Sequence, residues 1–566
     1  MDAPRPPSAI PYVLSALLWA LAGPSYPYMR LEFLAWVWMV PMLLALRPVE
    51  SLGGVLWRVY LTLLLSFAFI MSWVAVASPV GFVIAAFISA AVFTVPFVCM
   101  HFARRAFGWR AALLSLPFVW TAWEWLFHRT EHSFGAIEMG QSQANLYWLI
   151  QYVDVTGVWG IAFWLALFNA LVALAVSDWR AEETRGGAPL PFRVLARRLA
   201  KVFALMLLPP LAYSAFVFIG ETRRAQSGRE ISALLVQTNL NPYAPLDGDG
   251  AAYRIGRAAA LTRRALSEGK PDLVVWPEGT VLQLWSLDSE ARNNVRREVA
   301  RWQTPLLTGV IDARRAAEES RGGTQSAAAS YEFFNGAVML TPSAGETQGA
   351  GNTSAGTRDV RVSEPYYRRV LMPFVERVPY KERFPFSHIP ALRMDETSPE
   401  LTPGQRATVF DFPDRGGRQV TTAAVICYEQ LYPAETAEFV RGGAQVLAFL
   451  TNQGWFSKTH GPYELAALSR IRSIETRRTA LRAANTGVTW VVDAYGRVQA
   501  EVPWWSEQTL RVDVRLSDEL TLYVRYTDYL PKACLCVSLA LFLAAAWKRM
   551  RLRPRATEHV VGELKI

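Results

Sequence analysis

The chain has 566 residues, of which 52% are hydrophobic and only 19% are charged, and its formal net charge is +10. This length is too great for a single hydrophobic core, and the charged fraction is low for a soluble protein. Basic proteins usually bind nucleic acid or a membrane surface. Because the arginines here stand beside apolar runs, the composition favours the membrane and excludes nucleic acid as a partner.

Eight apolar runs predict an α-helical membrane domain with about seven helices before residue 220 and one helix after residue 528. Most runs approach the roughly 20 residues that a helix needs to cross a bilayer, and the first two are short enough to be tilted or re-entrant. The runs are Ile10–Ala22, Phe33–Leu46, Val55–Ala77, Val80–His101, Ala111–Leu126, Val158–Val176, Val202–Ile219 and Tyr529–Trp547.

Basic residues in the connecting loops predict the orientation of these spans, because cytoplasmic loops carry an excess of Lys and Arg. All of the basic groups fall on one side if the N-terminus is cytoplasmic, which places residues 221–528 outside the cytoplasm. In a bacterium this is the periplasmic face of the inner membrane. The basic residues are Arg5; Arg104, Arg105 and Arg110; Arg180, Arg185, Arg193, Arg197, Arg198 and Lys201; and Lys548, Arg549, Arg551, Arg553 and Arg555.

Two stretches of the membrane region carry polar side chains. Glu124 is either a functional group within the membrane or an interfacial residue, and the sequence leaves both interpretations open. The interfacial interpretation requires an aromatic belt formed by Trp120, Trp123 and Trp125. Residues 151–171 contain Asp154 and Asn169 among several small residues, a composition that favours close helix packing.

The segment between the seventh and eighth spans alternates strand and helix patterns, which predicts an α/β domain over residues 221–528. Residues 1–220 then form the transmembrane domain, and 529–566 form a C-terminal helix with a basic cytoplasmic tail. We expect helices at 253–269 and 465–485, and strands at 231–240, 271–280, 302–312, 331–340, 420–426, 444–456, 486–498 and 509–516.

Cys427 follows the apolar strand that runs from Val420 to Ile426 and precedes a helical pattern. A helix N-terminus favours a thiolate, so this position makes Cys427 a candidate nucleophile, although a buried structural cysteine is the alternative. The other cysteines, Cys99, Cys534 and Cys536, lie in apolar runs, so no disulfide framework is expected. The six histidines are scattered without metal-ligand spacing, so neither a metal nor an organic cofactor is expected.

Two further features have the chemistry that a cysteine nucleophile requires. A strand ends at Glu278, and the basic pair Arg368 and Arg369 precedes Pro373. Acyl transfer through a thioester needs a nucleophile, a base for its proton, and a positive group or N–H donors for the oxyanion. These side chains would supply all three if the fold brings them into one pocket.

The order of the motifs VVWPEG, then PF followed by Glu, then ICYE resembles the carbon–nitrogen hydrolase (nitrilase) superfamily. Together with the spans on both sides, the whole chain resembles the apolipoprotein N-acyltransferase family, which it also matches in QYVDVTGVWG, TNQGWF, AANTGVT and YVRYTD. The resemblance implies an αββα sandwich on the outer face of the bacterial inner membrane. It further implies the last step of lipoprotein maturation, in which an acyl chain passes from a phospholipid to a cysteine and then to the N-terminal amine of a diacylglyceryl-modified apolipoprotein.

Carried over to this chain, the resemblance makes Glu278 the general base and Cys427 the nucleophile. It also assigns supporting roles to Glu376, Tyr428 and Glu429.

Two positions depart from the family's pattern. Arg368 stands where the family generally has Lys, which keeps the charge without the compact ammonium group. Lys381 is a substitute whose position fits poorly. Val375 stands where the family usually has Gly, which predicts a different loop backbone.

Two other functions remain open from the sequence. One is a membrane-anchored amidase that passes its acyl group to water. The other is a catalytically weakened homologue that only binds lipoprotein or lipid, with Arg368 as the mark of lost chemistry. We expect the protein to act as a monomer.

Overall fold

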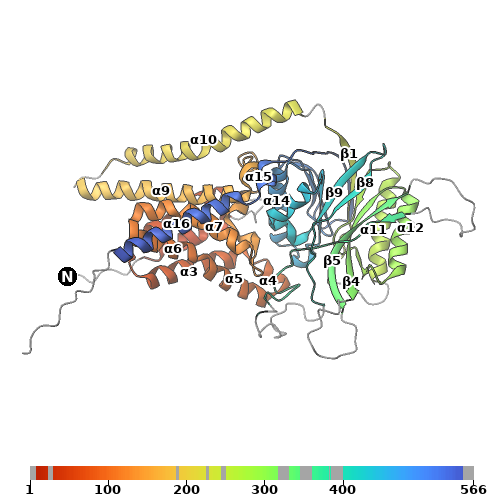
Figure 1. Ribbon diagram of the computed structural model, residues 1–566, viewed down its shortest axis with the longest axis horizontal. Coiled ribbons are helices and arrows are strands. Elements are labelled where there is room, and N and C mark those ends of the chain that lie inside the picture. Colours follow the sequence, from red (N-terminus) through yellow and green to blue (C-terminus); the bar gives the residue numbers. More distant parts are fainter. Residues whose placement is uncertain are drawn as a thin grey trace, which may run out of the picture.

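The computed structural model describes residues 8–22, 30–186, 190–224, 228–243, 250–315, 331–343, 360–380, 383 and 399–551. Long helices form one part of the molecule and two β-sheets with their covering helices form the other (Figure 1). The chain enters the second part after α10 and returns to the helices through α16 (Figure 1).

Each of the eight apolar runs forms helix. Three runs are interrupted, at residues 37–39, 71–73 and 94. Between the third and fourth runs, Ser78 separates α4 from α5, and its hydroxyl caps α5 by accepting the N–H of Gly81 at 3.1 Å. The helices of this part are α1 (Ile10–Ala22), η1 (Glu32–Trp36), α2 (Val40–Leu46), α3 (Leu52–Ile70), α4 (Val74–Ala77), α5 (Pro79–Phe93), α6 (Val95–Phe107), α7 (Trp109–His128), η2 (Gly135–Ile137), η3 (Met139–Gln143), α8 (Val153–Thr156), α9 (Val158–Gly186), α10 (Phe192–Arg224) and α16 (Tyr529–Arg551).

Five helical segments among the described residues are long and apolar enough to cross a membrane. Large apolar side chains such as Leu205 and Phe216 are 66% and 72% exposed on α10, which a lipid environment accounts for. The apolar segments Ile10–Ala22 and Glu32–Leu46 are shorter. The five segments are Leu52–Ile70, Pro79–Phe107, Val158–Glu183, Phe192–Glu221 and Tyr529–Arg551.

Of the two interpretations left open for Glu124, the interfacial one with an aromatic belt is wrong. Trp120 and Trp125 are buried, and Trp120 packs edge-on against Trp38 inside the bundle. Glu124 is buried as well, and its carboxylate accepts the backbone N–H of Met139 at 2.6 Å. This group therefore supports the interior of the bundle and does not lie at a lipid interface.

Asn169 links helices in the way that the packing interpretation of 151–171 predicts. Its amide donates to the carbonyls of Ala35 and Leu165 at 3.0 and 2.9 Å, and its oxygen accepts the N–H of Met39 at 2.8 Å. All of these groups are buried, so the side chain is fully used in joining α9 to the irregular segment before α2.

The second part is the expected αββα sandwich. One sheet has the order β14-β1-β2-β4-β5-β6, with β3 beside β4 and β7 beside β5, and the other has the order β13-β12-β11-β10-β9-β8. Its strands are β1 (Glu230–Gln237), β2 (Leu273–Val275), β3 (Val281–Leu284), β4 (Leu306–Arg315), β5 (Tyr331–Pro342), β6 (Val360–Val362), β7 (Tyr366–Tyr367), β8 (Val409–Pro413), β9 (Gln419–Ile426), β10 (Val446–Thr451), β11 (Ala480–Ala484), β12 (Thr489–Val492), β13 (Val498–Val502) and β14 (Gln508–Arg515).

Two pairs of helices cover the outer faces of the sandwich. Helices α11 (Gly250–Leu266) and α12 (Ser289–Trp302) pack on the first sheet, and α13 (Pro433–Arg441) and α14 (Gly461–Thr476) pack on the second. The parallel strands β9, β10 and β11 are apolar and almost fully buried, because the second sheet is covered on both faces.

The helix expected over 465–485 ends earlier, at Thr476. Arg477 adopts a left-handed backbone with φ of 51°, and β11 starts three residues later. The guanidinium of Arg477 bonds to Asp154 at 2.6 Å and to the side chain of Gln151 at 2.6 Å, both near α8. Contacts with the helical part therefore fix the end of α14, which local sequence patterns do not reveal.

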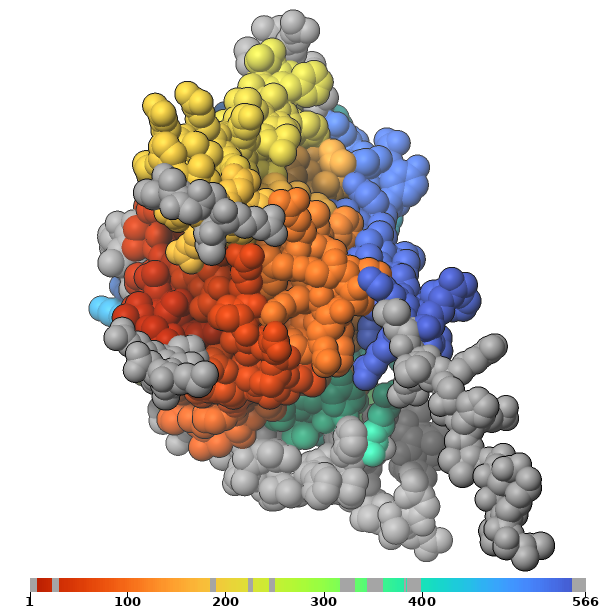
Figure 2. Space-filling view, turned by 90° about the vertical axis from the view of Figure 1, so that its left-hand side faces the viewer, coloured from red at the N-terminus to blue at the C-terminus, as the bar shows by residue number. Residues whose placement is uncertain are grey.

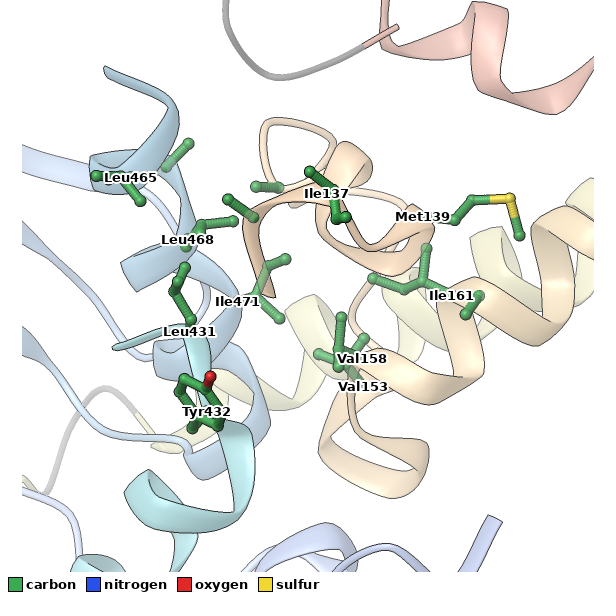
Figure 3. Packing of buried hydrophobic residues seen from close by; sticks show 14 of the residues in the cluster. Ile137, Met139, Val153, Val158, Ile161, Leu431, Tyr432, Leu465, Leu468 and Ile471 are labelled. Atoms are coloured by element: carbon green, nitrogen blue, oxygen red, sulfur yellow. The ribbon is translucent and has the colours of Figure 1, made fainter. Parts of the chain in front are cut away.

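Helix α14 joins the two parts of the molecule. Its residues Leu465, Leu468 and Ile471 face Val153, Val158, Ile161 and the loop around Ile137 and Met139 (Figure 3). The joint also has a polar contact, because the carboxylate of Glu475 accepts the N–H of Val158 at the start of α9 at 2.6 Å. One continuous hydrophobic core therefore runs from the long helices into the second sheet, and the elements that carry Cys427 are held against the helical part.

Candidate active site

Cys427 lies at the sharp turn between β9 and the short helix η7 (Cys427–Leu431). Its φ of 46° is left-handed, a conformation that is strained for a residue with a side chain. The carboxylate of Glu429 holds this turn by accepting the N–H of Ile426 at 2.9 Å. Glu429 is fully buried and also accepts the N–H of Arg369 at 2.7 Å and the hydroxyl of Tyr366.

Glu278 follows β2, and each of its two carboxylate oxygens accepts a hydrogen bond. One oxygen accepts the amide of Asn335 at 2.8 Å, and the other accepts the backbone N–H of Asn452 at 2.9 Å. On the neighbouring strand β4, a Cβ at Gly309 would lie 2.9 Å from the Cα of Glu278. The glycine therefore allows the close approach that places this carboxylate.

Arg368 lies beside Glu278 with its side chain only 2% exposed. Its Nη1 is 3.4 Å from Oε1 of Glu278, and its Nη2 forms an ion pair with Glu376. The Nε of Arg368 is buried and has no hydrogen-bond partner among the described residues. Glu376 is held in turn by the N–H of Met372 at 2.8 Å. A desolvated guanidinium with an available N–H is a suitable partner for a developing oxyanion.

The resting thiol of Cys427 is neutral, so the expectation of a thiolate stabilised by a helix N-terminus is wrong. Burial raises the pKa of this thiol well above its usual value, and the neighbouring Glu278 raises it further, against the opposing effect of Arg368. The helix α13 begins only at Pro433 and does not start at the thiol. Activation of Cys427 therefore requires removal of its proton by a base at the moment of reaction.

Burial also raises the pKa of Glu429, to about 7. The three donors that face this carboxylate lower the pKa and oppose the burial. Glu429 is thus a structural acceptor under Cys427, in contact with the turn and not with the cavity.

A cavity of about 490 Å³ opens at Cys427. Its polar lining includes Glu278, Arg368, Glu376, Gln430 and Asn452 beside the thiol. The rest of its wall is largely apolar and comes from both parts of the molecule, namely Trp73, Val74, Ala77 and Phe134 of the helical part and Met372, Val375, Tyr428, Phe456 and Leu465 of the sandwich. A largely apolar cavity with a few convergent polar groups is typical of a ligand site.

Comparison with known proteins agrees with this arrangement. Residues 249–520 match the carbon-nitrogen hydrolase family model, and residues 15–171 match the model of the apolipoprotein N-acyltransferase N-terminal domain. The apolipoprotein N-acyltransferase of Chlorobaculum tepidum is 36% identical over 543 residues, which cover 95% of this chain and 96% of that protein. The chain belongs to the apolipoprotein N-acyltransferase family.

Other apolipoprotein N-acyltransferases match over similar lengths. The protein from Geobacter metallireducens is 25% identical, with 95% of each chain covered. Among solved structures, Saccharomyces cerevisiae Nit3, a member of branch 10 of the nitrilase superfamily, is 15% identical with a TM-score of 0.34, over 58% of this chain and 96% of that chain. Family membership confirms a membrane-associated acyltransferase and favours it over the amidase.

The structure places each residue that the apolipoprotein N-acyltransferase resemblance singles out. Glu278, Arg368 and Cys427 come together at the cavity, and Glu376 contacts Arg368. Tyr428 forms part of the cavity wall and donates its hydroxyl to the carbonyl of Ser133 at 2.7 Å.

The structure accommodates Val375, the second departure from the family pattern. Val375 lines the cavity, and its backbone is not left-handed. The left-handed conformation is found at the preceding residue, Phe374, with φ of 63°. A side chain at 375 is thus compatible with this loop. Lys381 lies outside the described residues.

Two asparagines of the site were missed by sequence reasoning. Asn335 interrupts the apolar strand YEFFNGAVML, and Asn452 stands in TNQGWF directly after β10. Both contact the carboxylate of Glu278. A polar amide in the middle of an apolar strand is the signal that could have revealed Asn335, because such a group needs a buried partner.

Glu278→Gln should prevent acylation of Cys427. An amide cannot accept the thiol proton, and loss of a general base typically costs about 100- to 10,000-fold in rate. Intact-protein mass spectrometry after incubation with phospholipid measures the acylated fraction. Glu290→Gln, on the exposed face of α12, is the matched control and should acylate like the parent. Acylation of the Glu278 variant at the parental rate would show that Glu278 is not the base.

Proposed function

We propose that this protein N-acylates the N-terminal diacylglyceryl-modified cysteine of apolipoproteins, with a phospholipid as acyl donor and Cys427 as the carrier of the acyl chain. The observation that carries this proposal is the cavity at Cys427, in which Glu278 and Arg368 stand beside the thiol and apolar side chains supply most of the remaining wall. An acyl chain fits such a wall, and the ester fits the polar groups.

In the first half-reaction, Glu278 accepts the proton of the Cys427 thiol while the sulfur attacks the ester carbonyl of the phospholipid. The negative charge that develops on the carbonyl oxygen lies next to the guanidinium of Arg368. Collapse of the tetrahedral intermediate breaks the ester bond. The lysophospholipid leaves with the proton from Glu278, and a thioester remains on Cys427.

In the second half-reaction, the α-amine of the apolipoprotein cysteine attacks the thioester. Glu278 takes a proton from the attacking amine and returns it to the departing sulfur. The products are an amide on the lipoprotein and the free thiol of Cys427. Because the resting thiol is neutral, both half-reactions begin and end with the same protonation state of the site.

The domain organisation that we propose follows the chain. Residues 1–220 form a transmembrane domain, 221–528 form the catalytic domain, and 529–566 add a last transmembrane helix and a basic tail. The protein lies in the bacterial inner membrane with the catalytic domain on the periplasmic side.

The distribution of basic ends supports this orientation. The ends of α9 and α16 and the start of α10 lie at the end of the bundle far from the sandwich (Figure 1). Viewed onto this end, the N-terminal helices, the yellow α9 and α10 segments and the blue α16 all reach the surface (Figure 2). Polar contacts join neighbouring helices at this end. Lys548 of α16 donates to the carbonyl of Ala106 on α6 at 2.7 Å, and Arg110 of α7 pairs with Asp178 of α9 at 3.0 Å. Loops and helix ends that are rich in Lys and Arg are usually cytoplasmic, so this end of the bundle would face the cytoplasm.

The acyl carrier can be identified directly. The parent, incubated with phospholipid alone, should gain the mass of one acyl group on Cys427 and lose it when a diacylated lipopeptide is added, with N-acylated lipopeptide as the product. Cys427→Ser should retain the fold, by its thermal transition in detergent, and form neither species. Transfer by that variant at the parental rate would exclude the thioester mechanism.

Orientation can be tested with the exposed lysines. A membrane-impermeant amine reagent applied to intact spheroplasts should label Lys270 and Lys458 of the catalytic domain. Lys201 and Lys548 should react only after lysis, because they lie at the opposite end of the helices. Labelling in the reverse pattern would contradict the proposed topology.

Arg368→Ala should reduce the transfer rate by about 100- to 1,000-fold, the typical cost of losing one oxyanion donor. Arg368→Lys should keep much of the activity, since a cation remains beside Glu278. The neighbouring Arg369 pairs with Glu435 and Glu438 at 3.1 and 2.7 Å, so Arg369→Lys is the matched control and should behave like the parent. An inactive parent whose activity is restored by Arg368→Lys would instead indicate a weakened homologue.

A further inference from the structure

Trp73 connects the long helices to the catalytic cavity. It lies immediately before α4, is only 2% exposed, and lines the same cavity as Cys427. Its ring packs edge-on against Phe456 with centroids 4.6 Å apart, and against Phe134 at 5.9 Å. The position of this indole therefore determines part of the shape of the cavity wall.

A buried carboxyl group that the mechanism does not use holds this indole. Glu464, in the first turn of α14, is 1% exposed, and its Oε2 accepts the Nε1–H of Trp73 at 3.0 Å. Its other oxygen has no hydrogen-bond partner among the described residues. Burial raises the pKa of Glu464 to about 8, so the group is protonated at neutral pH and accepts the indole N–H without burying a charge.

The same turn of α14 also fits the face of the ring. Gly461 lies three residues before Glu464, so both residues share one side of the helix. A Cβ at Gly461 would lie 2.5 Å from Cδ2 of Trp73. The helix thus offers the indole a gap for its ring and an acceptor for its N–H, which together fix its position and its orientation.

We propose that Glu464 is a positioning residue for acyl transfer: by holding Trp73 it sets the part of the cavity wall against which the acyl chain of the donor packs. This inference rests on the proposed function, in which the acyl chain occupies this cavity. Without the acceptor, the buried N–H of Trp73 loses the hydrogen bond that it makes to Glu464. The indole of Trp73 then rotates, and the cavity wall no longer packs closely against a long acyl chain.

Three variants separate this role from a purely structural one. Glu464→Gln keeps a carbonyl acceptor and should show parental kinetics, whereas Glu464→Leu and Trp73→Phe remove the hydrogen bond from either side. For dipalmitoyl phosphatidylethanolamine, both removals should raise the KM by roughly tenfold, the order expected for one buried hydrogen bond, with kcat changed little. For the dihexanoyl lipid, whose short chains make little contact with the wall, the KM should be the same in all four proteins.

The double variant should be no worse than Trp73→Phe alone, because both substitutions remove one shared interaction. Three outcomes would each overturn the inference. They are parental kinetics in Glu464→Leu, an equal rise in KM for both lipids, and additive effects of the two substitutions in the double variant. If Glu464→Leu does not fold, Trp73→Phe decides the test through its KM for the two lipids. A parent that forms thioester on Cys427 while these variants show no chain-length effect refutes the inference alone. A parent without thioester refutes the proposed function, and this inference with it.

Discussion

The buried carboxylate of Glu429 is the contact on which the site depends. It gathers the end of β9, the hydroxyl of Tyr366 in β7 and the backbone of Arg369 around one buried carboxyl group. These segments carry the nucleophile and the cation, because Cys427 follows β9 and Arg368 precedes Arg369. Three buried donors converge on this one side chain, so it can hold the strained turn at Cys427 in place.

Burial determines how the site is activated. A thiol in a water-poor pocket beside a carboxylate keeps its proton, whereas an exposed thiol near a helix N-terminus would lose it. In the proposed mechanism, the reactive sulfur therefore forms only when Glu278 accepts the thiol proton, and the guanidinium of Arg368 balances the charge that develops on the substrate.

The joint between the two parts of the molecule shapes the catalytic cavity. Helix α14 packs against α8 and α9 through apolar residues (Figure 3). The same helix brings Gly461 and Glu464 to Trp73, directly before α4. Because the cavity wall combines residues of the helices with residues of the sandwich, neither part could form it alone. A continuous hydrophobic core across the joint fixes the position of one half of that wall relative to the other.

Local properties of the sequence were sufficient for the membrane helices and most strands, and the family resemblance supplied the sandwich and the candidate reactive residues. Span positions follow from runs of apolar side chains, strand positions follow from β-branched runs, and Glu278 and Cys427 stand at strand ends in recognisable motifs. Only the tertiary structure decided which groups are buried together. The end of α14 at Arg477, the burial of Trp120, the neutral thiol, and the bond between Trp73 and Glu464 each depend on partners distant in the chain. Burial and pairing set these properties, and a one-dimensional pattern does not record which residues meet.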